Sequence, residues 1–362
     1  MNIHMRPIRV IAGSRAYATI KKEGLSAERI YALAAAAGGP KWFTTYGLMR
    51  YVISDFIKDV DRPIHLIGAS VGSWQMAAAA TSDPGKAIDR LKRTYCEHIY
   101  SDKPSGQEIS EACRNIVENT VANEVDIILN NNLRHLHVLV TRIKGTTNLR
   151  SMIYQGGVLG IGAVANALGR RHMNLTFERS IFSSIKELPY YHEKDDLNTY
   201  SYGLSDANIV TALHASGAIP FVMDGVYHIT NAKQGAYWDG GITDYHMSFP
   251  YKADDQMVLL PHFTPRIMAG WFDKKLPWSR IANQGNMSDV VVLCPSEEYV
   301  SSLPKGSISQ MQDFYDFGED QEGRIKYWNE ICDRSLELAD HLHDLITTGS
   351  IAEVVELYPG GS

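Results

Sequence analysis

Residues 62–75 have the sequence Arg-Pro-Ile-His-Leu-Ile-Gly-Ala-Ser-Val-Gly-Ser-Trp-Gln and carry the clearest structural signal in the chain. The aliphatic run 64–68 is typical of a buried strand, and the alanine-rich run 76–80 is typical of a helix. Between them lies Gly68-x-Ser70-x-Gly72, the only pattern of this kind in the sequence. A serine on a tight turn between a strand and a helix projects its hydroxyl from the edge of a sheet, so this segment predicts a nucleophile elbow.

Short apolar runs alternate with helical patterns along most of the chain. Five further runs have the length and ends of buried strands, at 8–12, 30–35, 136–141, 256–261 and 290–295. Helical patterns lie between several of them, at 41–58, 73–81 and 115–130. This alternation predicts an α/β fold with a mainly parallel central sheet and helices on both faces.

The last quarter of the sequence differs from the rest. Strand-like runs become rare after residue 310, and apolar residues at helical spacing predict one long helix over 323–346. We therefore predict a main domain over residues 1–300 and a helical C-terminal extension over 301–362 that packs on it.

Composition excludes several classes of protein. The 362 residues include 35 Lys and Arg against 41 Asp and Glu, a net charge of −6, which disfavours binding to nucleic acid. The four cysteines form no CxxC pair, so common zinc and iron–sulfur patterns are absent. The N-terminal residues lack the pattern of a cleavable signal peptide, and no run of apolar residues is long enough to span a bilayer. The sequence predicts a soluble, cytoplasmic protein and indicates no oligomeric state.

A second glycine-containing loop, Ala36-Ala37-Gly38-Gly39-Pro40-Lys41, lies between a predicted strand and a predicted helix. Consecutive glycines there can turn their main-chain N–H groups into an anion-binding concavity, as an oxyanion hole requires. Proline has no N–H, so Gly38 and Gly39 are the candidate donors. A phosphate-binding loop is excluded, because that pattern needs another glycine before Lys41 and a Ser or Thr after it.

A serine nucleophile needs a base, and Asp239 is the first candidate. It is followed by Gly240 and Gly241, which permit a tight turn and close approach of the main chain. Asp239 could accept the proton directly, or it could be the acid of a triad with His246 or His262. Another Asp-Gly pair follows at Asp224, and the residues alone leave these alternatives open.

Four segments in this order resemble the patatin-like phospholipase family. They are Gly38-Gly39-Pro40-Lys41, Gly68-Ala69-Ser70-Val71-Gly72, Ala215-Ser216-Gly217-Ala218-Ile219-Pro220 and Asp239-Gly240-Gly241. The resemblance spans about residues 8–260 and implies a modified α/β-hydrolase fold, a three-layer sandwich. It selects Asp239 over Asp224 and the histidines.

The resemblance also implies a set of site residues. These are a Ser70–Asp239 dyad, oxyanion donors at Gly38 and Gly39, and support from Lys41 and Gly240, with no metal or cofactor. The family's loop commonly has an acid, a first glycine and a final glycine where this sequence has Ala36, Ala37 and Trp42.

The implied activity is lipid acyl hydrolysis of the phospholipase A or lysophospholipase type through an acyl-serine intermediate. The implied substrate is a phospholipid or another lipid ester. Two alternatives remain: a hydrolase of soluble esters or thioesters, and a non-catalytic member that binds lipid or protein.

Two segments are candidates for contact with lipid. Residues 270–280 mix large aromatic and basic side chains, so Trp271, Phe272 and Trp278 are candidates for peripheral membrane contact. The alternative is a loop whose aromatic residues pack on the core. The apolar run 156–168, which precedes Arg170 and Arg171, predicts either a buried helix or a flap over the site.

Overall fold

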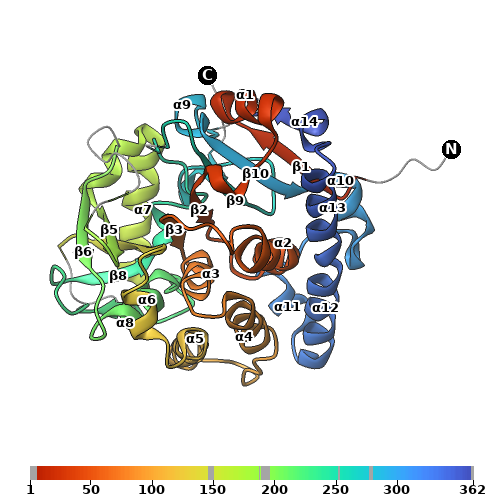
Figure 1. The fold of residues 1–362 in the computed structure, drawn as a ribbon. Coiled ribbons are helices and arrows are strands. Elements are labelled where there is room, and N and C mark those ends of the chain that lie inside the picture. Colours follow the sequence, from red (N-terminus) through yellow and green to blue (C-terminus); the bar gives the residue numbers. More distant parts are fainter. Residues whose placement is uncertain are drawn as a thin grey trace.

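The computed structural model describes residues 6–145, 151–186, 188, 196–251, 253–276 and 280–359. Within these residues the chain forms an 11-stranded sheet in the order β11-β1-β10-β9-β2-β3-β4-β5-β6, with β8 paired to β4 and β7 paired to β8 (Figure 1). The strands are β1 (Ile8–Ala12), β2 (Ile30–Ala35), β3 (Ile64–Ala69), β4 (Arg134–Ile143), β5 (Phe177–Ser183), β6 (Thr199–Gly203), β7 (Val226–Tyr227), β8 (Ala236–Asp239), β9 (Met257–Pro261), β10 (Val290–Pro295) and β11 (Glu356–Leu357).

The centre of the sheet is parallel, which confirms the predicted fold class. Strands β10, β9, β2, β3 and β4 run in one direction, whereas β1 is antiparallel to β10 and β5 is antiparallel to β4. All six strands expected from the sequence are present. Their residues are mostly buried on both faces, which is why they form continuous apolar runs rather than an alternating pattern.

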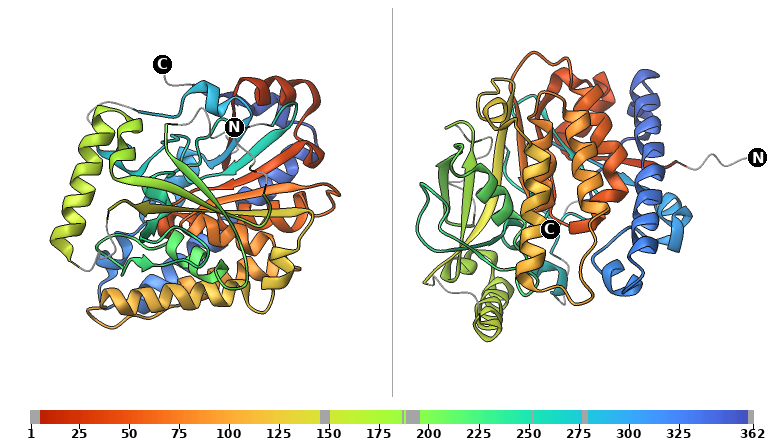
Figure 2. Two further views of the ribbon diagram at one scale, coloured as in Figure 1. Left: turned by 90° about the vertical axis from the view of Figure 1, so that its left-hand side faces the viewer. Right: turned by 90° about the horizontal axis from the view of Figure 1, so that it is seen from below.

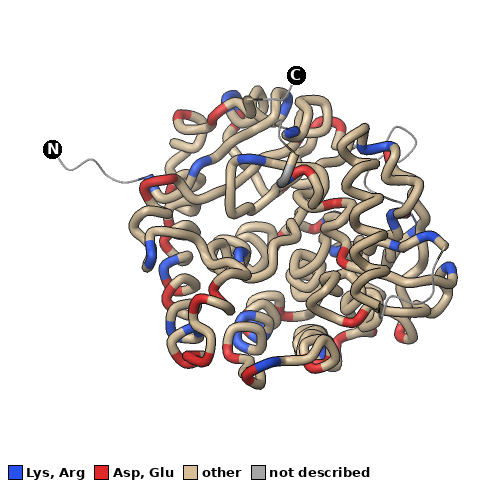
Figure 3. Tube along the Cα trace, turned by 180° about the vertical axis from the view of Figure 1, so that it is seen from behind, with Lys and Arg blue, Asp and Glu red and all other residues tan. Residues whose placement is uncertain are grey.

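Helices flank this sheet. They are α1 (Ser14–Glu23), α2 (Tyr46–Tyr51), α3 (Val71–Ala79), α4 (Pro84–Cys96), α5 (Gly106–Val121), α6 (Val125–Leu129), α7 (Met152–Leu168), α8 (Ile209–Ser216), α9 (Gln284–Met287), α10 (Glu297–Ser302), α11 (Asp313–Phe317), α12 (Gln321–Arg334), α13 (Leu336–Thr347) and α14 (Ile351–Val354). Helices α7 and α13 lie at opposite ends of the molecule (Figures 1 and 2). Charges of both signs are interspersed along the chain (Figure 3).

The two faces of the sheet belong to separate apolar clusters. Leu33 and Leu66 point to the face covered by α3, α4 and α12, where Trp74, Leu91 and Trp328 are buried. Their neighbours Ala34 and Ile67 point to the other face, under the segment that contains Tyr245, Met247 and Phe249. Successive residues of a strand alternate between faces, so one aliphatic run contributes to both layers.

Three of the expected helices differ from the prediction. The region 41–58 forms a 3₁₀ segment η2 (Gly39–Thr45), then α2, then a π-helical turn η3 (Val52–Phe56). The helix expected at 115–130 begins earlier, at Gly106, because Ser105 caps its first turn, and it ends before Ala122, which has a φ of 43°. The long helix expected at 323–346 is divided at Ser335, whose hydroxyl donates to the Cys332 carbonyl and accepts from the Gly47 amide.

The C-terminal residues are attached to the main sheet at several points. Strand β11 pairs with β1, and Arg9 forms an ion pair with Glu356 at 2.6 Å. Helix α13 packs on α2, where the Ser335–Gly47 hydrogen bond of 2.7 Å joins them. Residues 301–359 therefore share the core with the rest of the chain.

Candidate active site

Ser70 occupies a strained turn between β3 and α3. Its backbone has φ 56° and ψ −138°, a conformation that residues other than glycine rarely adopt. A Cβ at Gly68 would lie 2.5 Å from the Gly72 carbonyl, and one at Gly72 would lie 2.2 Å from the Ala35 carbonyl oxygen. The two glycines therefore allow α3 to start directly against β2 and β3, with Ser70 between them.

Sheet pairing brings Asp239 to Ser70. Ala69 of β3 pairs with Leu139 of β4, and the next residue of β4, Val140, pairs with Asp239 at the end of β8. The Ser70 hydroxyl donates a hydrogen bond of 2.6 Å to Oδ2 of Asp239. The Gly241 amide donates one of 2.7 Å to Oδ1. Both carboxylate oxygens thus have a partner, and both side chains are buried.

Burial governs the acidity of Asp239. Removing the carboxylate from water raises its pKa from 3.8 to about 6, while the hydrogen bonds from Ser70 and Gly241 act in the opposite direction. The group is therefore ionised at neutral pH, yet it is a stronger base than an exposed aspartate. This is the protonation state that accepting a hydroxyl proton requires.

One of the two predicted oxyanion donors, Gly39, lines the same cavity as the serine. Gly38 and Gly39 follow β2, and Gly39 lines the same cavity as Ser70 and Val71. The amides of Gly38, Gly39 and Val71 donate no hydrogen bond to any described residue. Val71 begins α3, where helix N–H groups are unpaired and the dipole is positive. Its amide is a candidate donor that the sequence reasoning did not identify.

The small-residue block 215–220 holds the main chain at Ser70 and Asp239 in place. The Ser216 hydroxyl accepts a hydrogen bond of 2.9 Å from the Ser70 amide and donates one of 2.6 Å to the Leu139 carbonyl. The Asp239 amide donates to the Ala218 carbonyl at 2.9 Å. The sequence marked this block through the family resemblance but gave Ser216 no role.

The alternative bases lie elsewhere. His246 and His262 are buried against each other, with ring centroids 4.2 Å apart, and burial lowers the pKa of His262 to about 3. Asp224 is exposed, its amide donates a hydrogen bond of 3.0 Å to the Ser110 hydroxyl, and its carboxylate makes no hydrogen bond to Ser70. Asp239 is the carboxylate that contacts Ser70.

Two lysines bring positive charge to this region. Lys41 is half-buried, with its ammonium 4.9 Å from the centre of the Phe263 ring, and burial lowers its pKa. Lys274 is exposed as a whole, but its ammonium lies 3.6 Å from the centre of the Tyr245 ring, and desolvation together with the charge of Lys41 lowers its pKa to about 7. Lys274 also favours the ionised form of Asp239. The sequence reasoning did not single it out.

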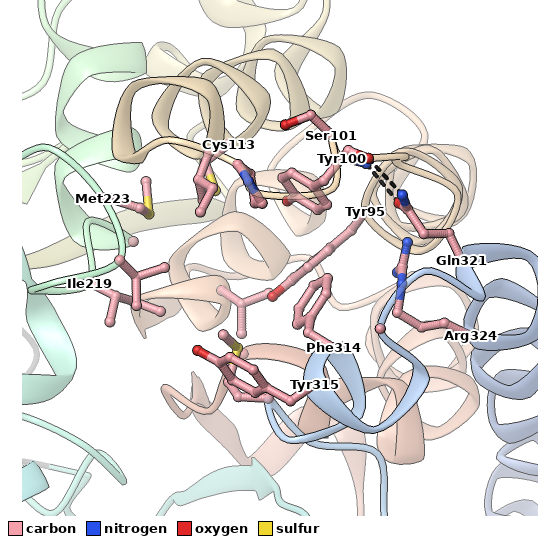
Figure 4. Close-up of a pocket in the computed structure, with 18 of the residues that line it drawn as sticks. Tyr95, Tyr100, Ser101, Cys113, Ile219, Met223, Phe314, Tyr315, Gln321 and Arg324 are labelled. Carbon is pink, nitrogen blue, oxygen red and sulfur yellow. Dashed lines mark hydrogen bonds between the residues drawn. The ribbon is translucent and has the colours of Figure 1, made fainter.

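A cavity of about 350 Å³ opens from Ser70. Its walls come from three parts of the chain (Figure 4). They are the α4–α5 region, the segment 217–223, and the α11–α12 region. The first contributes Tyr95, Tyr100, Ile109 and Cys113, the second Gly217, Ile219, Val222 and Met223, and the third Met311, Phe314, Gln321 and Arg324. Most of these side chains are apolar, and the Tyr95 hydroxyl points into the space.

The C-terminal wall of the cavity is fastened to the oxyanion loop. The buried Ser309 hydroxyl donates a hydrogen bond of 2.7 Å to the Pro40 carbonyl. The Gln321 side chain and the Tyr100 main chain exchange hydrogen bonds of 2.7 and 2.6 Å at the edge of the cavity (Figure 4). The Met311 sulfur lies 3.0 Å from the position a Cβ would take on Gly39. Residues more than 230 positions after Ser70 thus complete its surroundings.

The candidate membrane residues have different surroundings. Trp271, in the short helix η7 (Trp271–Lys275), is partly exposed. Phe272 is buried beside Phe177, with ring centroids 6.0 Å apart, so it packs on the core as in the alternative interpretation. Trp278 lies outside the described residues. None of the described helices is both long and apolar enough to cross a membrane.

These features define a mixed α/β protein with a serine at a strand–helix turn, hydrogen-bonded to a buried aspartate. A family model for patatin-like phospholipases matches residues 33–247, which include the glycine loop, the elbow, the small-residue block and Asp239. The chain therefore belongs to the patatin-like phospholipase family, and this membership indicates lipid acyl hydrolase activity in general.

The chain was also compared with solved structures and with curated proteins. The crystal structure of VipD from Legionella pneumophila is similar with a TM-score of 0.34 and 11% sequence identity, over 94% of this chain and 71% of that chain. No curated protein gave a significant sequence match.

Proposed function

We propose that this protein is a phospholipase A- or lysophospholipase-type hydrolase that cleaves carboxylic esters of lipids with Ser70 as nucleophile and Asp239 as base. The observation that carries the proposal is the 2.6 Å hydrogen bond from the Ser70 hydroxyl to the Asp239 carboxylate. It joins a potential nucleophile, which lines a mainly apolar cavity, to a potential base buried behind it.

The first half of the reaction acylates the serine. Asp239 accepts the hydroxyl proton while the Ser70 oxygen attacks the ester carbonyl. The free amides of Gly39 and Val71, with Gly38 beside them, donate to the oxyanion, and one such donor is typically worth about 3–4 kcal/mol of barrier reduction. Asp239 then gives the proton to the departing alcohol oxygen as the C–O bond breaks.

The second half restores the enzyme. A water molecule loses a proton to Asp239 and attacks the acyl-serine carbonyl. The carbonyl–Ser70 bond breaks, the serine oxygen takes the proton back, and the fatty acid leaves. The apolar cavity would hold the acyl chain in both halves of the reaction. Longer acyl chains would bury more apolar surface there and would therefore be favoured over short ones.

The proposal is tested by covalent labelling and by product analysis. A fluorophosphonate probe should label the wild type, and Ser70→Ala should lose both labelling and hydrolysis. Ser110→Ala is the matched control, because this serine is also buried but bonds to Asp224. Full hydrolysis by Ser70→Ala would disprove the proposal.

A panel of substrates distinguishes the alternatives. Phospholipid vesicles, lysophospholipid, soluble short-chain nitrophenyl esters and acyl thioesters should be compared by mass spectrometry of the products. A preference for the phospholipids supports the proposed class. Higher kcat/KM on the soluble esters or thioesters would indicate a soluble-ester hydrolase instead.

A further inference from the structure

Helix α7 has an unusual composition for a helix on the surface. Its 17 residues, Met152–Leu168, contain no charged side chain. The helix lies at the edge of the molecule, separated from the main helical layer (Figure 2). Ile153 is 90% exposed and Leu168 is 75% exposed, and Ile161 and Val164 are also well exposed. These four residues are spaced as one side of a helix, and we call this side the α7 face.

The opposite side of α7 is firmly packed. Val158 and Leu159 belong to a buried cluster with Phe177 and Phe272. A Cβ on Gly162 would lie 2.3 Å from the Phe177 ring, so the helix lies close against it. Asn166 donates a hydrogen bond of 2.7 Å to Asp273. The α7 face is therefore presented to solvent by a helix with a fixed position.

The apolar surface continues from α7 to the wall of the candidate active site. The Phe221 amide donates a hydrogen bond of 2.8 Å to the side-chain oxygen of Gln155 in α7. The exposed Phe221 ring lies 4.0 Å from the position of a Cβ on Gly156. The residues on either side of Phe221 in sequence, at 219, 222 and 223, line the cavity. A layer that covers the α7 face would thus lie next to one wall of this cavity.

The charges around the α7 face indicate what covers it. Residues 151–176 contain Arg170 and Arg171 but no acidic residue, in a chain whose net charge is −6. Arg171 is exposed just beyond Leu168. The acidic residue of η7, Asp273, is buried and paired with Arg280. The apolar face therefore has a positive margin.

We propose that the α7 face docks on an anionic lipid bilayer. Aliphatic side chains would enter the acyl boundary, and Arg171 would meet the anionic headgroups. A second copy of the chain is a less suitable occupant, since a two-fold contact sets the same patch against itself and brings its positive margins together. The link to catalysis rests on the proposed function, but the binding itself does not.

The test is flotation of the full chain with phosphatidylcholine vesicles, prepared with and without phosphatidylserine. We expect binding that is stronger with phosphatidylserine. The double variant Ile161→Gln/Val164→Gln should lower the partition coefficient at least about tenfold on either vesicle, since it removes two aliphatic anchors. Arg171→Glu should weaken binding only to the anionic vesicles.

Two controls make the outcome decisive. Ile127→Gln/Leu336→Gln changes two exposed aliphatic residues on helices away from α7 and should bind as the wild type does. Hydrolysis of a soluble short-chain ester should be unchanged in every variant. If neither the wild type nor the variants hydrolyse phospholipid or the soluble ester, the proposed function fails, and the vesicle result still decides this inference.

Two results would overturn the inference. One is equal vesicle binding by the wild type and the α7 double variant. The other is sedimentation velocity showing a wild-type dimer that the double variant converts to monomer, because the α7 face would then be covered by a second copy.

Discussion

Asp239→Asn should stabilise the protein at neutral pH while abolishing ester hydrolysis. The folded protein raises the pKa of Asp239 from 3.8 to about 6, because the ionised carboxylate is buried. Between these values the folded state keeps a proton that the unfolded chain has lost. The unfolding free energy of the wild type therefore falls as the pH rises from about 4 to about 6.

The size of the effect follows from the shift. One pKa unit corresponds to about 1.4 kcal/mol, so a shift of about two units corresponds to about 3 kcal/mol. Asparagine has nearly the same shape and no charge, so it avoids this cost above pH 6. For a chain of 362 residues the entropy of unfolding is about 0.8 kcal/mol/K, and the variant should melt about 4 °C higher at pH 8.

The assay is thermal and urea denaturation of both proteins from pH 4 to pH 8. The difference should be near zero at pH 4 and largest above pH 6. In the wild type, kcat/KM should rise with an apparent pKa of about 6, because the base must be ionised. Asp224→Asn, at an exposed aspartate, is the control and should show neither effect. A stability difference independent of pH, or an active Asp239→Asn variant, would refute the reasoning.

Three other substitutions probe the elbow and the cavity. Ser216→Ala leaves a buried amide and a buried carbonyl without their partner, so urea denaturation should show a loss of about 1–3 kcal/mol, and an unchanged midpoint would contradict this role. Gly72→Ala places a Cβ 2.2 Å from the Ala35 carbonyl oxygen and should destabilise by about 1–3 kcal/mol or more, whereas Gly160→Ala, where no atom lies within 4 Å, should not destabilise. Phe314→Ala enlarges the cavity and should move the preferred nitrophenyl ester toward longer acyl chains, so an unchanged chain-length profile would argue against an acyl site there.

The parallel strands of the core could be predicted because each one is marked by a short run of its own sequence. Strands such as β3 and β10 are aliphatic runs buried on both faces, and each ends in a turn residue. Strand β5 was not predicted, because Glu178 and Arg179 interrupt its apolar pattern. Arg179 is buried with Asp244, at 2.6 and 2.7 Å, and a partner 65 residues away is not visible in a short window.

In the candidate site, too, some residues could be predicted from local motifs and others could not. The motifs located Ser70, Asp239 and the glycine loop, and the structure brings the first two into hydrogen-bond contact. The contributions of Ser216 and Val71 depend on how strands and helices meet, so no motif could assign them. The wall around Phe314 depends on long-range packing of a segment that the family match does not include.

The bond between Ser309 and Pro40 has a consequence for protein engineering. A fragment trimmed to the recognised family region would lose strand β9, which pairs with β2, and would also leave the cavity beside Ser70 open to water on one side. Conversely, grafting the stretch 309–324 from a relative would exchange the lining without touching the chemistry. A fragment that retains the whole cavity must therefore be longer than the matched region, because residues near the C-terminus form part of its wall.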